Sequence, residues 1–179
     1  MSVVSGDIYS PNFQVENIFT LDDVENSNHW LTPDQSGGAF ILNFGCTPTF
    51  QAIVLVNTHN AQHRDRSTRH FRFFAPDLWP VIFSIPRLFA GQTEAGAWTQ
   101  VLDTELADSR QQQDSDPARL QMIMLDNKVT ARFVKFELIT WWGKSGGLQF
   151  FEIFRDTGKN NMTYFIRNGG LIMITIARI

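Results

Sequence analysis

The chain has 179 residues, enough for one domain with a complete hydrophobic core. Hydrophobic residues make up 43% of it, and sixteen Phe and five Trp set it apart from disordered chains, which are poor in aromatic residues. Fifteen basic and eighteen acidic residues give a formal net charge of −3. This balance, without a cluster of Lys or Arg, argues against a nucleic-acid-binding protein.

Cys46 is the only cysteine, so no disulfide forms within the chain, and we expect a buried thiol in a reducing compartment rather than a reactive nucleophile. The N-terminal stretch lacks both the basic and the apolar region of a signal peptide, and no apolar stretch approaches the roughly 20 residues of a membrane span. We therefore expect a cytoplasmic chain without a membrane span, or an extracellular one if the sequence is a fragment. The sequon at Asn161 would require a secretory route.

In chain order, the sequence is a succession of short apolar segments bounded by polar or turn-forming residues. They are rich in Ile, Val, Phe and Trp, which favour strands, and no stretch of ten or more residues has a convincing helical period. Seven or more strands without intervening helices predict an all-β sandwich or barrel. The predicted strands are GAFILNFG (38–45), FQAIVLVN (50–57), RHFRFFA (69–75), WTQVL (98–102), LQMIML (120–125), ARFVKFELI (131–139) and LQFFEIF (148–154).

The alternation of a half-buried strand is clearest in the sixth of these segments. Val134, Phe136 and Leu138 would face a core, whereas Lys135 and Glu137 would point outward.

Three segments fit the strand pattern less well. Residues 104–113 are polar and rich in Gln, and we expect one short turn there. Residues 76–89 are apolar but interrupted by three prolines, which predicts an insertion between two strands. Residues 168–179 follow a polar loop and are rich in β-branched side chains, which predicts an extra strand or a loosely placed tail.

The turn LDDVENSNHWLT resembles the Asp-Gly-Asp-Pro-x-Thr-x-Trp turn near the start of discoidin domains, also called coagulation factor 5/8 type C domains. Asp23 and Glu25 take the places of the two Asp, Asn28 that of the Thr, and Trp30 that of the Trp. The later motifs are similar in the same order, and the ordered set carries the resemblance. They are GGAFILNFGCTPTFQAIVLVN, DRSTRHFRFFA, GAWTQVL and ARFVKFELITWWGKSGGLQFFEIF.

The resemblance implies a jelly-roll β-sandwich of the galactose-binding-domain-like class. It covers about residues 17–154 and is broken by the insertion at about 76–89. We expect one domain with two flanking segments. They are an N-terminal lead-in (1–16), the discoidin-like domain (17–157) and a C-terminal tail or extra strand (158–179).

The segment NTHNAQHRDRST (57–68), directly after an apolar strand, carries many hydrogen-bonding groups and no large apolar side chain. The resemblance places it and TWWGKSGGL (140–148) near the ligand-binding end of the sandwich, where loops carry polar groups on a rigid scaffold. Such groups suit a hydroxyl-rich sugar, and an indole offers it an aromatic face. The candidate ligand-binding residues are His59, Asn60, His63, Arg64, Asp65, Trp141 and Trp142.

Scaffolding of the loop stays open as the alternative: Asp65 and Arg66 could pair with each other, and the two Trp could belong to the core. Asn57, closest to the strand, is the most clearly structural candidate. A metal site at His59 and His63 would require a helix, which the pattern does not predict. No paired carboxylates or nucleophile motif indicates an enzyme.

The turn at 22–28 is a second candidate site, because it crowds carboxylate and amide oxygens of the kind that calcium prefers. The resemblance implies a structural calcium ion there, closed by a Glu near the end of the domain. A solvated acidic turn is the alternative, and Val24 stands where the family usually has Gly. The candidate metal ligands are Asp23, Glu25, Asn28 and Glu152.

Together these features predict non-catalytic binding of a glycan or glycoprotein, in adhesion or lectin-like attachment. Two alternatives remain open: a module that binds a protein partner through the same loops, and a targeting domain of a larger enzyme.

Overall fold

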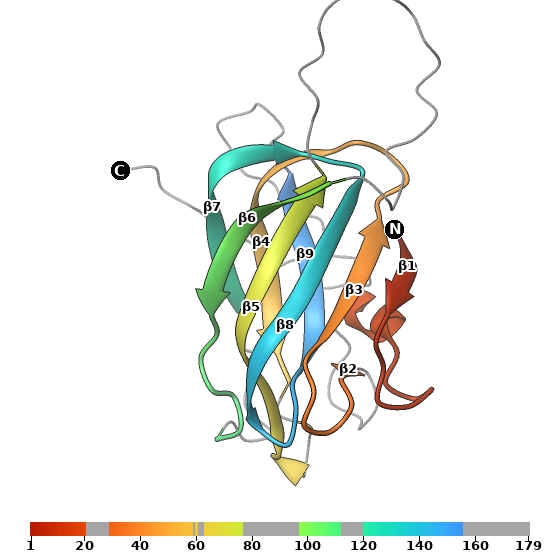
Figure 1. The fold of residues 1–179 in the computed structure, drawn as a ribbon. Coiled ribbons are helices and arrows are strands. Elements are labelled where there is room, and N and C mark those ends of the chain that lie inside the picture. The colour runs from red at the N-terminus through yellow and green to blue at the C-terminus, as the bar shows by residue number, and fades with distance from the viewer. Residues whose placement is uncertain (21–28, 59, 61–62, 77–96, 112–119, 156–179) are drawn as a thin grey trace, which may run out of the picture.

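A computed structural model of the chain describes residues 1–20, 29–58, 60, 63–76, 97–111 and 120–155. Two antiparallel sheets pack face to face, as Figure 1 shows. The strands are, in spatial order, β1 (Ser2–Gly6), β3 (Gly38–Asn43), β8 (Phe133–Gly143), β5 (Arg66–Pro76) and β6 (Trp98–Glu105) in one sheet, and β2 (Trp30–Leu31), β9 (Gly147–Arg155), β4 (Thr49–Asn57) and β7 (Leu120–Thr130) in the other.

All seven predicted strands are confirmed, and the fold class with them: each of the seven segments forms a strand of this sandwich. The structure adds three elements that the sequence did not predict. Residues 2–6, in the expected lead-in, form β1 and pair with β3, and Val15–Phe19 forms a short 3-10 helix, η1. Trp30 and Leu31 form the two-residue strand β2, which pairs with β9.

The predicted alternation of β8 is confirmed. Val134, Phe136 and Leu138 are buried in the core, and Lys135 and Glu137 form an ion pair of 3.0 Å on the other face. This face pattern arises because successive side chains of a strand point to opposite sides of the sheet.

An aromatic stack fills the centre of the sandwich. The Phe136 ring stacks between Phe71, with ring centroids 4.7 Å apart, and Phe40, at 5.1 Å. The Trp30 indole meets both Phe40 and Phe136 edge-on. The core is therefore made of interlocking aromatic rings contributed by both sheets, with Phe151 of β9 meeting Phe40 from the other side.

Residues 104–105 complete β6, because strand pairing with β5 extends to Glu105, and the short turn expected in the 104–113 segment lies at Arg110 and Gln111. One local prediction was wrong: Cys46 is exposed rather than buried. It follows Gly45, whose positive φ of 73° and hydrogen bond to the Asn43 side chain bring the chain into a surface bend between β3 and β4.

Pro76 ends β5, and the rest of the predicted insertion lies outside the described residues, as does the predicted tail or extra strand at 158–179. Within the described part of the chain, no helix is long and apolar enough to cross a membrane.

Candidate functional site

The two loops that the sequence predicts near a ligand-binding end do meet. Residues 63–66 and 143–147 lie together at the lower end of the sandwich in Figure 1. The Lys144 backbone N–H donates to the Asp65 carbonyl at 2.7 Å. Gly143 allows this approach, because its φ is +83° and an added Cβ would lie 2.3 Å from the same carbonyl.

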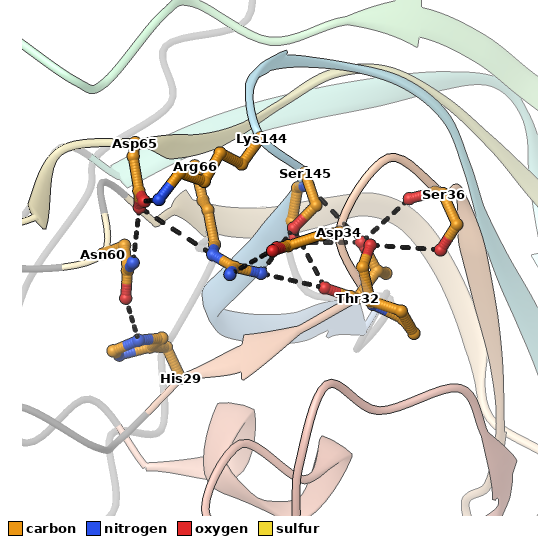
Figure 2. A network of polar contacts seen from close by, with 11 residues as sticks. His29, Thr32, Asp34, Ser36, Asn60, Asp65, Arg66, Lys144 and Ser145 are labelled. Atoms are coloured by element: carbon orange, nitrogen blue, oxygen red, sulfur yellow. Dashed lines mark hydrogen bonds and ion pairs between the residues drawn. The ribbon is translucent and has the colours of Figure 1, made fainter.

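A buried arginine joins three segments at this end (Figure 2). Arg66 is only 4% exposed and donates to the Thr32 carbonyl at 3.1 Å and to Ser145 Oγ at 2.8 Å. Its guanidinium also pairs with the carboxylate of Asp34 and lies 4.1 Å from the centroid of the Tyr9 ring. A planar guanidinium can serve such divergent acceptors at once, and we infer a scaffolding role for Arg66.

Asn60 and Asp65, both candidate ligand-binding residues, are engaged within the protein (Figure 2). Asn60 is 7% exposed and adopts a left-handed φ of 59°. Its amide nitrogen donates to Asp65 Oδ1 at 2.6 Å, and its amide oxygen accepts from His29 Nε2 at 3.3 Å. Asp65 also accepts from Lys144 Nζ at 2.9 Å. These two side chains hold the loop in shape.

Asp65 and Arg66 form the ion pair that the sequence suggested, with Arg66 Nε 3.8 Å from Asp65 Oδ1. The shorter contacts of each residue go to other partners, such as Ser145 for Arg66 and Asn60 for Asp65.

The pKa of Asp65 shows how its surroundings favour the carboxylate. Burial alone raises this pKa, but hydrogen bonds from Asn60 and Lys144 and the charges of Lys144 and Arg66 outweigh it and hold the pKa below its usual range. A group whose pKa is depressed by folding contributes stability above its unfolded pKa of about 4, and this contribution disappears as the pH falls through the folded value.

We expect Asp65→Asn to flatten the acid limb of the stability curve. Urea unfolding at pH 7, 5, 4 and 3 should show that the variant loses less unfolding free energy between pH 5 and pH 3 than the wild type. An equal loss in both proteins would contradict the role of the ionised carboxylate.

Asn57 is structural, as predicted. Its side-chain nitrogen donates to the carbonyls of Thr68 at 2.8 Å and Ala107 at 3.0 Å, and its oxygen accepts from the Thr68 N–H at 2.9 Å. Ser109 adds a second link, because its hydroxyl donates to the Thr58 carbonyl at 2.6 Å and lies 3.0 Å from Ser67 Oγ. The segment after β6 is thereby fixed against the loop that follows β4.

The adjacent Trp141 and Trp142 have different surroundings. Trp141 packs against the hydrophobic core. Trp142 is half-buried, with the Arg69 guanidinium 4.6 Å and the Arg110 guanidinium 6.0 Å from its ring centroid. Its Nε1 is buried and has no hydrogen-bond partner within the described part of the protein. The two indoles thus differ in their described contacts: Trp141 packs on the core, and Trp142 lies beside two guanidinium groups.

Carboxylates accompany both guanidinium groups beside Trp142. Arg69 pairs with Glu105 at 3.3 Å, and Arg110 binds Asp108 through three hydrogen bonds of 2.8–3.2 Å. The pKa of Asp108 is lowered mainly by these bonds, against the effect of burial. An aromatic ring thus lies beside fixed donors and acceptors, and we call these five residues the Trp142 cluster.

The remaining candidates of the polar loop are only partly described. His63 is exposed, and its backbone N–H closes a turn with the Asn60 carbonyl at 3.0 Å. Arg64 is half-buried with a positive φ of 49°. His59 lies outside the described residues.

The calcium prediction stays a prediction, because Asp23, Glu25 and Asn28 lie outside the described residues. Glu152 is exposed on β9, opposite Val54 of β4. Among the residues that the structure describes, no three His, Cys, Asp or Glu side chains gather as a metal site.

Arg69, Glu105, Asp108 and Arg110 were not among the candidates from the sequence. The pattern could assign Arg69 only to a strand, and Arg110 lies in the Gln-rich segment read as a turn. Their approach to Trp142 depends on the pairing of β5 with β6 and β8, which no local pattern specifies.

No protein-family model and no curated protein matches the chain in sequence. Solved structures do match its fold. A family 32 carbohydrate-binding module from Streptococcus pneumoniae EndoD is 12% identical with a TM-score of 0.59, over 87% of this chain and 95% of that one. The family 32 module of C. perfringens NanJ, in complex with galactose, is 12% identical with a TM-score of 0.57, over 83% and 90%.

A GH29 fucosidase from Ruminococcus gnavus, in complex with fucose, is 14% identical with a TM-score of 0.54 over 82% of this chain, which spans only 23% of that enzyme. At such identities the likeness concerns the fold alone. The two antiparallel sheets and these neighbours together establish that the chain has the discoidin-like, galactose-binding-like jelly-roll fold.

Proposed function

We propose that this protein binds glycans without catalysis, through the Trp142 cluster and the polar loop beside it. The observation that carries the proposal is the half-buried Trp142 ring next to the Arg69–Glu105 and Arg110–Asp108 pairs. The pairs lie at the end of the sandwich where the loops meet, on a scaffold fixed by Arg66 and Asn57.

The chemistry of the cluster suits a sugar. The C–H face of a sugar ring can lie on an indole. A sugar hydroxyl can donate a hydrogen bond to a carboxylate and accept one from a guanidinium, and the cluster offers both groups. The similar family 32 module of C. perfringens NanJ, solved in complex with galactose, supports this class of ligand. Attachment or adhesion to glycan-bearing surfaces is the cellular role that we propose for such binding.

Trp142→Ala should weaken glycan binding at least about tenfold, which corresponds to about 1.4 kcal/mol. The reason is that it removes the aromatic face while leaving the core intact. A glycan array with the full chain identifies a ligand, and isothermal titration of the variant against that ligand measures the loss. The melting temperature should change little, because Trp142 is not part of the hydrophobic core.

Trp141→Ala is the matched control on the neighbouring residue. It should lower the melting temperature, because Trp141 packs on the core, and it should affect binding only through stability. Unchanged affinity in both Trp142→Ala and Arg69→Ala, with a ligand in hand, would place any glycan site on another face. An array without any binding would contradict the proposed function itself.

We also propose a second role for the same binding site, in which this domain targets a larger glycan-active enzyme to its substrate. Two of the similar structures are GH29 proteins of which this chain spans only 23% and 26%. In that setting the module would hold the enzyme on its substrate by raising the effective concentration.

Calcium binding by the 22–28 turn is proposed separately. If Asp23 and Glu152 help to hold the ion, millimolar calcium should raise the melting temperature by mass action, and Asp23→Ala should abolish the rise. Differential scanning calorimetry with calcium and with a chelator measures this. If calcium does not shift the melting temperature of the wild type, or shifts that of the variant equally, the proposed calcium site is wrong.

A further inference from the structure

Tyr9 is an exposed aromatic residue on the segment between β1 and η1. Its exposed fraction is 45%, and among the aromatic side chains that the structure describes it is the most exposed. Its backbone N–H donates to the Leu31 carbonyl at 2.8 Å, and Leu31 pairs with Gly147 at the end of the 143–147 loop. Tyr9 is therefore fixed next to one of the two loops that meet at the candidate ligand-binding end.

A buried guanidinium supports the Tyr9 ring. The Arg66 Cζ lies over the ring, 4.1 Å from its centroid. Arg66 is only 4% exposed, and it donates to the Thr32 carbonyl and to Ser145 Oγ, so its position is fixed by the scaffold. Because the guanidinium lies over one face of the ring, the exposed area belongs to the other face and the edge. The cation also helps to hold the ring in place through its attraction to the ring electrons.

An exposed carboxylate accompanies this ring. Asp34 pairs with the guanidinium of Arg66, as Figure 2 shows, and its side chain is 49% exposed. The next residue, Gln35, donates its backbone N–H to the Lys144 carbonyl at 2.8 Å, which ties the loop of Asp34 to the loop that carries Lys144. Tyr9 and Asp34 contact the same guanidinium, so an aromatic face and a hydrogen-bond acceptor are held close together. We call Tyr9, Asp34 and Arg66 the Tyr9 group.

The Tyr9 group repeats the chemistry of the Trp142 cluster without sharing a residue with it. Arg69 lies 4.6 Å from the Trp142 ring centroid and pairs with Glu105 at 3.3 Å. In both places an aromatic ring lies beside a guanidinium that is paired with a carboxylate. The two arginines, Arg66 and Arg69, are three residues apart on β5, which is about 10 Å along the strand. The two rings are thus supported from nearby positions of one strand, close enough for a chain of a few sugar units to contact both.

We propose that the Tyr9 group is a second position for a sugar ring, and that the preferred ligand is an oligosaccharide rather than a monosaccharide. The inference rests on the proposed function, because the first sugar unit occupies the Trp142 cluster. A second unit places its C–H face on the exposed face of Tyr9 and donates a hydroxyl hydrogen to the Asp34 carboxylate. Once the first unit is bound, the second binds within the same complex, which raises the affinity of the whole ligand.

Titration calorimetry with the full chain tests the proposal with two probes, the oligosaccharide that a glycan array identifies and its constituent monosaccharides. The wild type should bind the oligosaccharide at least about tenfold more tightly than any of the monosaccharides. Tyr9→Ala should lose that advantage and bind the monosaccharides as the wild type does. Trp142→Ala should weaken the binding of both probes, because it removes the first position.

Two further variants control for the loss of packing. Tyr9→Phe keeps the ring and should retain the affinity for the oligosaccharide. Ile8→Ala truncates the neighbouring side chain, which is 38% exposed, and should change neither affinity.

Two results would overturn the second position: Tyr9→Ala with the affinity of the wild type for the oligosaccharide, or Tyr9→Ala with an equal loss for both probes. An equal loss would mean that Tyr9 acts on the first position or on the scaffold. A wild type that binds no glycan on the array would instead contradict the proposed function itself, and the second position with it.

Nitration of the wild-type protein gives a second measurement that does not depend on the folding of a variant. Tetranitromethane nitrates exposed tyrosines, and peptide mapping by mass spectrometry gives the extent of nitration at Tyr9. A saturating concentration of the oligosaccharide should slow this nitration several-fold, whereas monosaccharide that saturates the Trp142 cluster should leave it nearly unchanged. Equal nitration with and without the oligosaccharide would contradict the second position.

Discussion

Arg66→Ala should lower the free energy of unfolding by about 3 kcal/mol, because it leaves buried acceptors without their donor. In the native protein the guanidinium satisfies the Thr32 carbonyl and Ser145 Oγ, pairs with Asp34 and covers one side of Tyr9. Removing it disconnects three segments at the loop end. Urea denaturation followed by tryptophan fluorescence measures the change.

Two further variants show whether the loss of stability comes from the buried network of Arg66 or from removing any arginine. Arg66→Lys keeps the charge but cannot reach two divergent acceptors with a planar fork, so it should recover only part of the stability. Arg72→Ala, on the same strand, removes an exposed arginine with one ion pair and should cost far less. If both alanine variants cost equally little, the buried network would not be the scaffold of the loop end.

Phe136→Ala should be the most destabilising change in the core, at about 3–5 kcal/mol. Its ring is fully buried and stacks on Phe71 and Phe40, and the Trp30 indole meets it edge-on. Truncation opens a cavity between the two sheets that these rigid rings cannot fill by collapsing. For a domain of this size such a loss lowers the melting temperature by about 10 °C, which calorimetry resolves.

Phe74→Ala is the control for ring removal as such. Phe74 lies on the neighbouring strand β5 but is only half-buried, with the Lys135 amine 5.1 Å from its ring centroid. Its truncation should cost clearly less, because a partly exposed site leaves a smaller void. A Phe136→Ala protein as stable as Phe74→Ala would mean that the aromatic stack does not dominate the core.

Comparing sequence and structure separates local signals from those that need the whole fold. The sequence by itself determined the strands, because their signals are local: the alternation of Val134, Phe136 and Leu138 and the apolar run AIVLV before the polar loop. It could not place β1 or β2, since short edge strands carry little pattern of their own and depend on partners far along the chain. The apolar run forms a buried strand, as predicted, but only the fold shows that β4 lies between β7 and β9 in its sheet.

The polar loop after β4 was found from composition alone, yet composition could not assign roles within it. Asn60 and Asp65 offer the same groups to a sugar as to each other, and only the fold decided that they bind within the protein. Trp141 and Trp142 are likewise indistinguishable in sequence. In the tertiary structure Trp141 packs against the core, whereas Trp142 lies beside Arg69 and Arg110. The physical reason is that strand periodicity is encoded by neighbours in sequence, whereas the partners of a polar side chain are set by strand pairings between residues far apart in the chain.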